Sequence, residues 1–140
     1  MVAHTLVTDG RGAVLLMRRA GSGYGDGRLA FPAGHVDLGE TPLECVVREV
    51  EEKLGLRLVR GLLLRRGLMF RRSQEPRVDV FFRVPARGWA GVPQIREPGK
   101  CTGLVWADPH ALPQGVLGYV GRALDNDRSG RGYDEVGWKR

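Results

Sequence analysis

One stretch, residues 34–56, constrains this chain more than any other. It reads GHVDLGETPLECVVREVEEKLGL and leads from a loop carboxylate into a segment where charged side chains crowd into little more than one helical turn. Side chains three or four positions apart are neighbours on a helix, so these acids repel one another unless a cation lies among them. The pattern predicts a surface that attracts a counter-ion. The crowded residues are Arg48, Glu49, Glu51 and Glu52.

The helix inside this stretch is predicted by its two ends and its apolar stripe. Thr41 is a candidate N-cap, Pro42 suits the first helical position, and Glu44 completes a capping box. Gly55 is typical of the residue that ends a helix. With the stripe facing a core, the acidic residues are left together on a separate flank. The stripe consists of Leu43, Val46, Val47, Val50 and Leu54.

Length and composition indicate an ordinary globular chain. Its 140 residues suit one domain, so we expect a single domain over residues 1–140. An apolar content of 42% with 27% charged residues is too apolar for a disordered protein. No apolar run is long enough to cross a membrane, and the N-terminus lacks a signal-peptide core, so we expect a cytoplasmic location and no membrane partner. Cys45 and Cys101 are expected to be unpaired thiols, since two cysteines do not make a disulfide scaffold.

The net charge of +6 comes mainly from arginine and favours anionic partners. The arginines are scattered and are not interleaved with aromatic residues, which argues against a dedicated nucleic-acid binder. Two interpretations stay open: a solvated basic surface, or a small phosphate-bearing substrate.

Apolar runs separated by turn signals predict several strands around the central helix. The first two are expected to form a hairpin around residues 9–12, and a second helix is predicted at residues 115–124. The glycine-rich loop, residues 20–27, is either part of an active site or plain surface. The tail is either frayed or docked through Tyr133 and Trp138. This order predicts an α/β fold with a mixed sheet between helices. The expected strands are residues 4–8, 13–17, 56–64, 67–72, 78–84 and 102–106.

Residues 34–56 resemble the signature of the MutT-like Nudix hydrolases, G-x5-E-x7-R-E-U-x-E-E-x-G-U, where U is aliphatic. Chance rarely matches eight positions across two long fixed spacings. One position departs, because Lys53 stands where the family has the second of its paired glutamates. The resemblance implies a Nudix-like α/β/α sandwich and extends more weakly over the rest of the chain. The matching residues are Gly34, Glu40, Arg48, Glu49, Val50, Glu52, Gly55 and Leu56.

The resemblance implies hydrolysis of a pyrophosphate bond in a nucleoside diphosphate-linked small molecule, assisted by Mg²⁺ or Mn²⁺. Clustered carboxylates are hard oxygen ligands that suit Mg²⁺. The alternative is a weakened Nudix module that binds nucleotides as a sensor or within a partner complex, with Lys53 as the mark of lost metal affinity. A basic RNA-binding module is a third alternative and would need a continuous arginine face. A homodimer is left open.

Carried over position by position, the resemblance implies roles for five residues. Glu49 is the principal metal ligand and a candidate base, and Glu52 is the next ligand. Glu40 is a supporting acid that acts through water or a second metal ion. The backbone carbonyl of Ala33 is a further ligand, and Arg48 orients the glutamates by ion pairing.

Residues beyond these five complete the candidate site. Glu97 is either a replacement acid from outside the signature or a solvated loop residue. Lys53 would repel Mg²⁺ but could contact a phosphate. His35 and Tyr24 are candidates for substrate binding. Base-stacking candidates are the aromatic residues Tyr24, Phe31, Phe70, Phe81 and Trp106.

Overall fold

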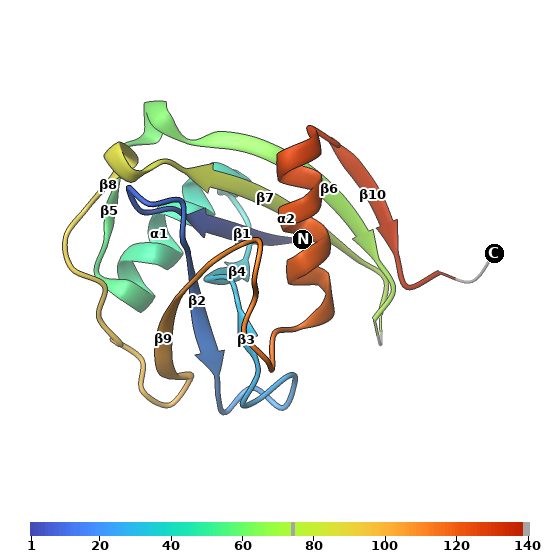
Figure 1. The fold of residues 1–140 in the computed structure, drawn as a ribbon, viewed down its shortest axis with the longest axis horizontal. Helices are drawn as coiled ribbons and strands as arrows, with labels where there is room; N and C mark the ends of the chain where they lie inside the picture. Colours follow the sequence, from blue (N-terminus) through green and yellow to red (C-terminus); the bar gives the residue numbers. More distant parts are fainter. Residues whose placement is uncertain (74, 139–140) are drawn as a thin grey trace.

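The computed structural model describes residues 1–73 and 75–138 and places a mixed five-stranded sheet at the centre of the protein. The sheet runs in the order β10-β6-β7-β1-β4, with β1 parallel to β7, β10 parallel to β6, and the remaining pairs antiparallel. Helices α1 and α2 lie on its two faces, which confirms the predicted α/β/α arrangement (Figure 1). The bounds are β1 Val2–Val7, β4 Ala33–His35, α1 Pro42–Leu54, β6 Leu64–Arg71, β7 Arg77–Val84, α2 Gly118–Ser129 and β10 Tyr133–Val136.

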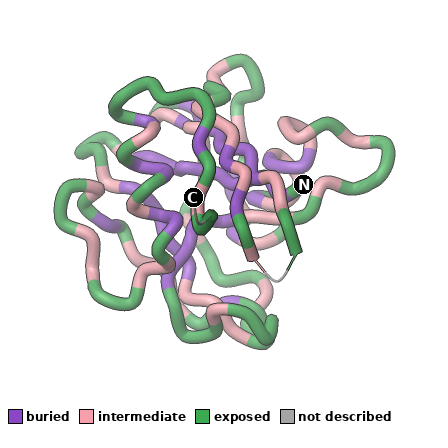
Figure 2. The backbone as a smooth tube through the Cα atoms, turned by 90° about the vertical axis from the view of Figure 1, so that its right-hand side faces the viewer, coloured by how far each residue is buried: buried purple, intermediate pink, exposed green. Residues whose placement is uncertain are grey.

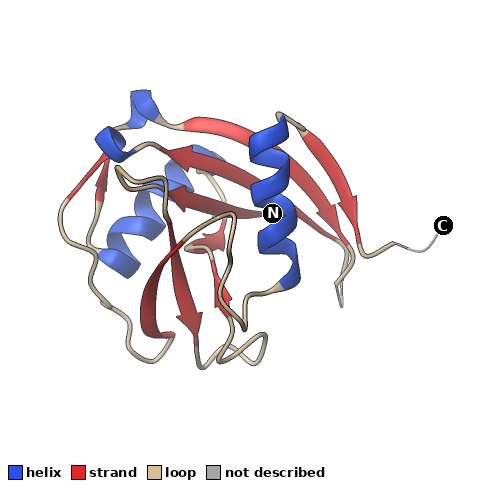
Figure 3. Ribbon diagram, viewed as in Figure 1, coloured by secondary structure: helices blue, strands red, loops and turns tan. Residues whose placement is uncertain are grey.

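The remaining elements lie around this sheet (Figure 3). A three-stranded sheet has the order β3-β2-β9, and β5 pairs with β8. The strand predicted over residues 56–64 is wrong for most of its length, because only two residues pair and a 3-10 turn follows. The bounds are β2 Val14–Arg19, β3 Leu29–Ala30, β5 Arg57–Leu58, η1 Arg60–Leu62, η2 Ala86–Gly88, β8 Trp89–Ala90 and β9 Cys101–Ala107.

The predicted N-terminal hairpin is confirmed only next to its turn, where Thr8 and Val14 form one antiparallel bridge. The turn itself forms, since the Asp9 carboxylate accepts hydrogen bonds from the backbone N–H groups of Arg11 and Ala13, each 2.9 Å long. The two strands nevertheless belong to different sheets. Every residue of β1 is buried, one of its edges pairs with β7 along its whole length, and the first three residues of its other edge pair with β4.

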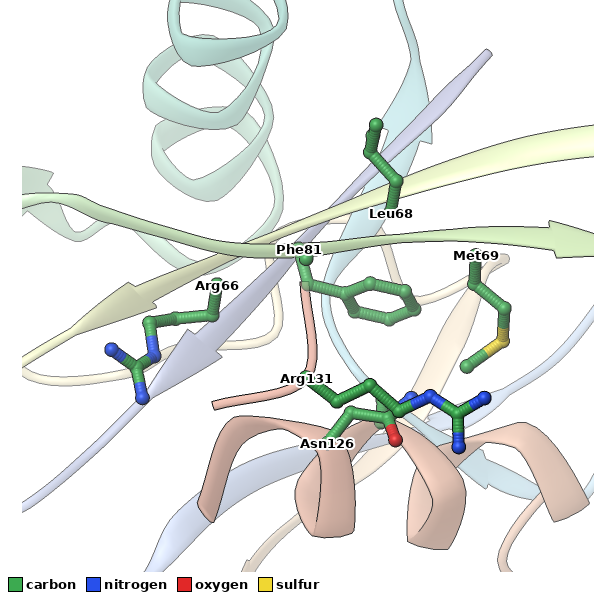
Figure 4. A pocket seen from close by; sticks show the side chains of 8 residues that line it. Arg66, Leu68, Met69, Phe81, Asn126 and Arg131 are labelled. Carbon is green, nitrogen blue, oxygen red and sulfur yellow. The ribbon is translucent and has the colours of Figure 1, made fainter. Parts of the chain in front are cut away.

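The core lies on both faces of the central sheet, and buried positions run through the interior strands while the loops are exposed (Figure 2). Figure 4 shows Met69 and Phe81 pointing toward α2, whereas Leu68 points to the opposite face. Successive residues along a strand therefore pack against different helices, one on each face of the sheet. The hollow beside Phe81 has a volume of about 10 Å³, which is room for about one water and excludes a ligand.

Helix α1 begins and ends as predicted. The Thr41 hydroxyl accepts a hydrogen bond from the Glu44 backbone N–H at 3.1 Å, and the Glu44 carboxylate accepts one from the Thr41 N–H at 3.0 Å. Gly55 has φ 71°, a left-handed conformation that favours glycine, and its N–H donates to the Glu51 carbonyl. The helix buries Cys45, Val46, Val50 and Leu54, which leaves its charged flank free to face another part of the molecule.

The tail is docked rather than frayed within the described residues. Strand β10 extends the sheet beside β6, and the Trp138 ring stacks on Phe70 with centroids 5.1 Å apart. Asp134 is buried and accepts hydrogen bonds from Arg122 at 2.6 Å and Asn126 at 2.9 Å. Over these described residues, neither helix combines the length and the apolar content that a membrane span requires.

Candidate functional site

A cleft of about 1140 Å³ brings together most of the residues that the sequence predicts to be functional. Its walls come from the charged flank of α1, strand β4, the glycine-rich loop and the segment before β9. The glycine-rich loop therefore borders this cleft. Of the predicted site residues, Glu40 and Arg48 lie outside the lining of this cleft. The predicted residues that line it are Tyr24, Ala33, His35, Glu49, Glu52, Lys53 and Glu97.

Strand β4 passes close to α1 because Gly34 has no side chain. A Cβ at this position would overlap the Glu49 carboxylate group. Pairing of Ala3 with Gly34 holds β4 against β1, and α1 packs on β4. Glycine is thus required here by a close approach between backbone and carboxylate.

The Cys45 thiol of α1 also contacts β4. It is buried and unpaired, and its sulfur lies 3.6 Å from the Gly34 carbonyl and 3.4 Å from the His35 carbonyl. Burial raises the pKa of Cys45 to about 12, and the nearby charges of Glu40 and Glu49 add to the shift. Cys45 therefore stays a neutral thiol that donates toward β4, and Cys101 is likewise a buried free thiol.

Arg48 connects the glutamates of the signature. Its guanidinium donates to Glu40 at 2.7 and 3.1 Å, to Glu49 at 3.0 Å and to Glu52 at 3.3 Å. The hydrogen bond from Arg48, followed by one from the Asp37 backbone, lowers the pKa of Glu40 to about 2. Arg48 thus holds the carboxylates by ion pairing and is not among the residues that line the cleft. Glu40 is hydrogen-bonded to the Arg48 guanidinium.

Lys53 binds the other side of Glu49. Its ammonium donates to the Ala33 carbonyl and lies 3.3 Å from Glu49 Oε2, while Arg48 holds Glu49 Oε1. The Glu49 carboxylate is therefore enclosed by two cations, and its side chain is only 14% exposed. The family resemblance assigns the Ala33 carbonyl and Glu49 to a metal ion, and Lys53 contacts both of them.

Glu97 presents an unsatisfied acceptor. Its Oε1 atom is buried and has no hydrogen-bond partner among the described residues. The Glu97 backbone carbonyl accepts hydrogen bonds from the Lys100 and Cys101 N–H groups at 2.9 and 3.0 Å, which fixes the loop in place. A buried acceptor without a partner costs about 1–3 kcal/mol, so this oxygen is suited to accept a cation or a hydrogen-bond donor.

The oxygen donors of the cleft fit a divalent ion in part. Glu52 is half-exposed and Glu97 has a free buried oxygen, and both are the hard ligands that Mg²⁺ accepts. The fit fails at Ala33, whose carbonyl is bound to Lys53. Within residues 1–73 and 75–138, no group of three acidic, histidine or cysteine side chains converges as a ready metal site.

Sequence reasoning missed a buried polar cluster at the cleft. His4 Nε2 lies 2.8 Å from Asp79 Oδ1, and Arg71 Nε donates to Asp79 Oδ2 at 2.9 Å. Burial lowers the pKa of His4, and because Asp79 can only accept, the neutral ring carries its proton on Nε2. Burial opposes ionisation of Asp79, but the hydrogen bond from His4 and the nearby arginine charges outweigh it and lower its pKa. A histidine and an aspartate inside apolar strand runs were the available signal.

Tyr24 joins this cluster to the glycine-rich loop. Arg71 Nη1 donates to the Tyr24 hydroxyl at 3.0 Å. Of the five aromatic candidates, all in the described part of the chain, Tyr24 alone lines the cleft. Phe31 and Phe81 are buried in the core. Trp106 stacks on Trp89, and Phe70 stacks on Trp138.

Comparison with known proteins agrees with the fold and the signature. Residues 1–123 match the family described as the NUDIX domain, and the chain belongs to that family. The crystal structure of a MutT NUDIX hydrolase from Burkholderia pseudomallei superposes with a TM-score of 0.78 at 26% identity, covering 89% of this chain and 95% of that one. A MutT protein from Methanosarcina mazei superposes with a TM-score of 0.75 at 20% identity, which supports the fold alone.

Two curated relatives share part of the sequence. The 8-oxo-dGTP diphosphatase of Haemophilus influenzae is 33% identical over 87 residues, which cover 62% of this chain and 60% of that protein. The 8-oxo-dGTP diphosphatase of Escherichia coli is 33% identical over 55 residues, covering 39% of this chain and 43% of that protein. The chain thus spans between about two fifths and three fifths of the length of these relatives.

Proposed function

We propose that this protein hydrolyses a pyrophosphate bond in a small nucleotide, assisted by Mg²⁺ or Mn²⁺. The observation that carries the proposal is a single cleft lined by Glu49, Glu52 and Glu97, the last with an unpartnered oxygen. Its volume of about 1140 Å³ is ample for a nucleotide, since small-molecule sites are commonly about 300–1,000 Å³. The names of the curated relatives make 8-oxo-dGTP the first substrate to test.

The charged residues of the cleft have separate tasks in this proposal. Glu52 and Glu97 would hold a divalent ion, whose chemistry when bound would be to neutralise phosphate charge and lower the pKa of water. Arg19 and Lys100 also line the cleft and attract an anionic substrate. Arg48 keeps the carboxylates in place from behind the cleft, without contact to the phosphate.

The nucleoside is expected beside the glycine-rich loop. Tyr24 and Tyr119 line the cleft, and an aromatic ring offers a nucleobase a flat apolar contact. Tyr119 is buried under the Arg71 guanidinium, which lies 4.0 Å from the ring centroid, so Tyr24 is the more accessible of the two. We therefore assign Tyr24 to substrate binding, and His35 to the exposed rim of the same cleft.

A second candidate function is a Nudix module that binds nucleotides without cleaving them. The observation that favours it is the contact of Lys53 with both the Ala33 carbonyl and Glu49. A unit positive charge there weakens the attraction of a divalent ion for the same oxygens. Such a module would bind nucleotides in the cleft and release no phosphate.

A nucleotide panel separates the two functions. The purified protein is incubated with 8-oxo-dGTP, nucleoside triphosphates, sugar nucleotides and dinucleotide polyphosphates, with Mg²⁺ or Mn²⁺, and the products are separated by chromatography. We expect cleavage at a pyrophosphate bond, lost in Glu49→Gln and kept in Glu51→Gln, since Glu51 is exposed on the same helix and outside the cleft lining. Full activity of Glu49→Gln would refute the catalytic assignment, and binding without cleavage would favour the second function.

A further inference from the structure

The ammonium of Lys53 lies at a point where two oxygen atoms from different elements converge. One is the Ala33 carbonyl of β4, and the other is Oε2 of Glu49, one turn earlier on α1. A carbonyl and a carboxylate facing one point form a cation site. We propose that Lys53 is a tethered cation that takes the place of one divalent metal ion in this centre.

Burial makes this contact a fixed part of the site. The Lys53 side chain is 21% exposed and that of Glu49 is 14% exposed, so the pair is shielded from most of the solvent. Gly34 allows β4 to pass close to the Glu49 carboxylate, which brings the Ala33 carbonyl within reach of the ammonium. A lysine ammonium is a compact point charge with three rotatable donors, so it can bind both oxygens at once.

A lysine in place of a metal ion changes the charge at this position, but the two oxygens still have a cation bound to them. An ammonium supplies one positive charge where a divalent ion would supply two, and it cannot be removed by a chelator. A metal ion that bound the same two oxygens would lie against this ammonium, and like charges a few ångströms apart repel strongly. The remaining oxygens, on Glu52 and Glu97, are free of Lys53 and can still bind metal.

Lys53 also has a donor left for the substrate. One of its N–H groups donates to the Ala33 carbonyl, the ammonium pairs with Glu49 by charge at 3.3 Å, and the residue lines the cleft. A remaining N–H can donate to a phosphate oxygen, a role that rests on the proposed hydrolase function. In this arrangement one residue replaces a metal ion in both of its contacts, with the protein and with the phosphate.

Counting bound metal tests the replacement without any substrate. Mn²⁺ is titrated into the wild-type protein, Lys53→Glu and Lys53→Gln, and free Mn²⁺ is measured by electron paramagnetic resonance. We expect both variants to bind one more Mn²⁺ per chain than the wild type, with affinity about tenfold or more higher for the glutamate variant. Lys100→Glu is the matched control, because Lys100 lines the same cleft and gives the same charge change, and it should not add this ion.

The result that overturns the inference is an equal number of Mn²⁺ ions, bound equally tightly, in the wild type and both Lys53 variants. An equal gain in Lys100→Glu would overturn it too, since general charge would then explain the effect. Circular dichroism checks folding, and Lys53→Gln provides the count if the extra carboxylate prevents Lys53→Glu from folding. The nucleotide panel is read separately. If the wild type is inactive but the Lys53 variants bind the extra Mn²⁺, only the proposed function is refuted. If the wild type is active but the wild type and the Lys53 variants bind equal numbers of Mn²⁺, only this inference is refuted.

Discussion

Arg48 donates to both oxygens of the Glu40 carboxylate, with Nη2 to Oε1 at 2.7 Å and Nε to Oε2 at 3.1 Å. Such a two-point contact fixes orientation as well as distance. Glu40 lies in the loop before α1 and Arg48 in the middle of that helix, so the pair ties the loop to the helix. Arg48 Nη1 reaches Glu49 and Glu52, which ties the acidic flank of α1 to the same guanidinium.

This pair predicts a specific loss of stability in acid. The pKa of Glu40 is lowered from 4.5 to about 2, so its contribution is fully present above pH 4.5 and is lost as the pH falls from 4.5 toward 2. We expect the free energy of unfolding of Glu40→Gln to fall less steeply over this range than that of the wild type. Urea unfolding at several pH values measures it. Glu51→Gln should keep the wild-type slope, and a parallel slope for Glu40→Gln would contradict the prediction.

Gly34→Ala should impair catalysis more than folding. The added Cβ overlaps the Glu49 carboxylate and displaces it, and a shift of about 1 Å in a catalytic group can lower a rate about 100-fold. Overpacking costs about 1–3 kcal/mol of stability. Steady-state kinetics and urea unfolding give the two values. Gly61→Ala is the control, because nothing lies within 4 Å of its added Cβ; a Gly34→Ala enzyme with wild-type kcat would show that Glu49 does not need its present position.

Glu97→Gln should change activity and stability in opposite directions. If Glu97 binds metal or acts as a base, the rate should fall by about 100-fold or more. The unpartnered buried oxygen belongs to the Glu97 carboxylate itself, and the variant replaces this carboxylate with a neutral amide. The free energy of unfolding should therefore rise by up to about 1 kcal/mol. Kinetics and thermal unfolding are measured on the same preparation. A Glu97→Gln protein that keeps full activity would place Glu97 among ordinary loop residues.

Asp79→Asn should destabilise the whole fold. Asp79 is completely buried and pairs with His4 and Arg71, and removing one charge from a buried pair costs about 3–5 kcal/mol. Chemical denaturation gives the change in the free energy of unfolding. Asp108→Asn, at an exposed turn, should stay within about 0.5 kcal/mol of the wild type. A similar small change for Asp79→Asn would mean that the cluster adds little to stability.

The sequence predicts local features of this fold well and distant pairings poorly. The capping box of α1 and the turn at Gly55 depend on residues a few positions apart, so their pattern is readable along the chain. The N-terminal hairpin was predicted from a local turn, but β1 pairs with β7, about 75 residues away, as in the contact of His4 with Phe81. Competition among distant strand edges decides that pairing, and no local pattern contains it.

The site follows the same rule. The spacing of the signature identifies Glu49 and Glu52, and the departure at Lys53 is visible in the sequence. The contact of Lys53 with the Ala33 carbonyl is not, because it depends on how closely β4 approaches α1. The partnerless oxygen of Glu97 likewise appears only when the loop before β9 has been placed against the cleft.

Helix α1 buries Val46 and Val50, while Arg48, Glu49, Glu52 and Lys53 of the same helix form its charged flank. Core packing and the charged flank therefore depend on one helix, and a change on either face affects the other. The glycine-rich loop lines the cleft together with Ser73, Glu75 and Pro76 between β6 and β7, and all of these lie outside residues 34–56. We expect changes in these segments to alter which ligand binds while the packing of α1 stays the same.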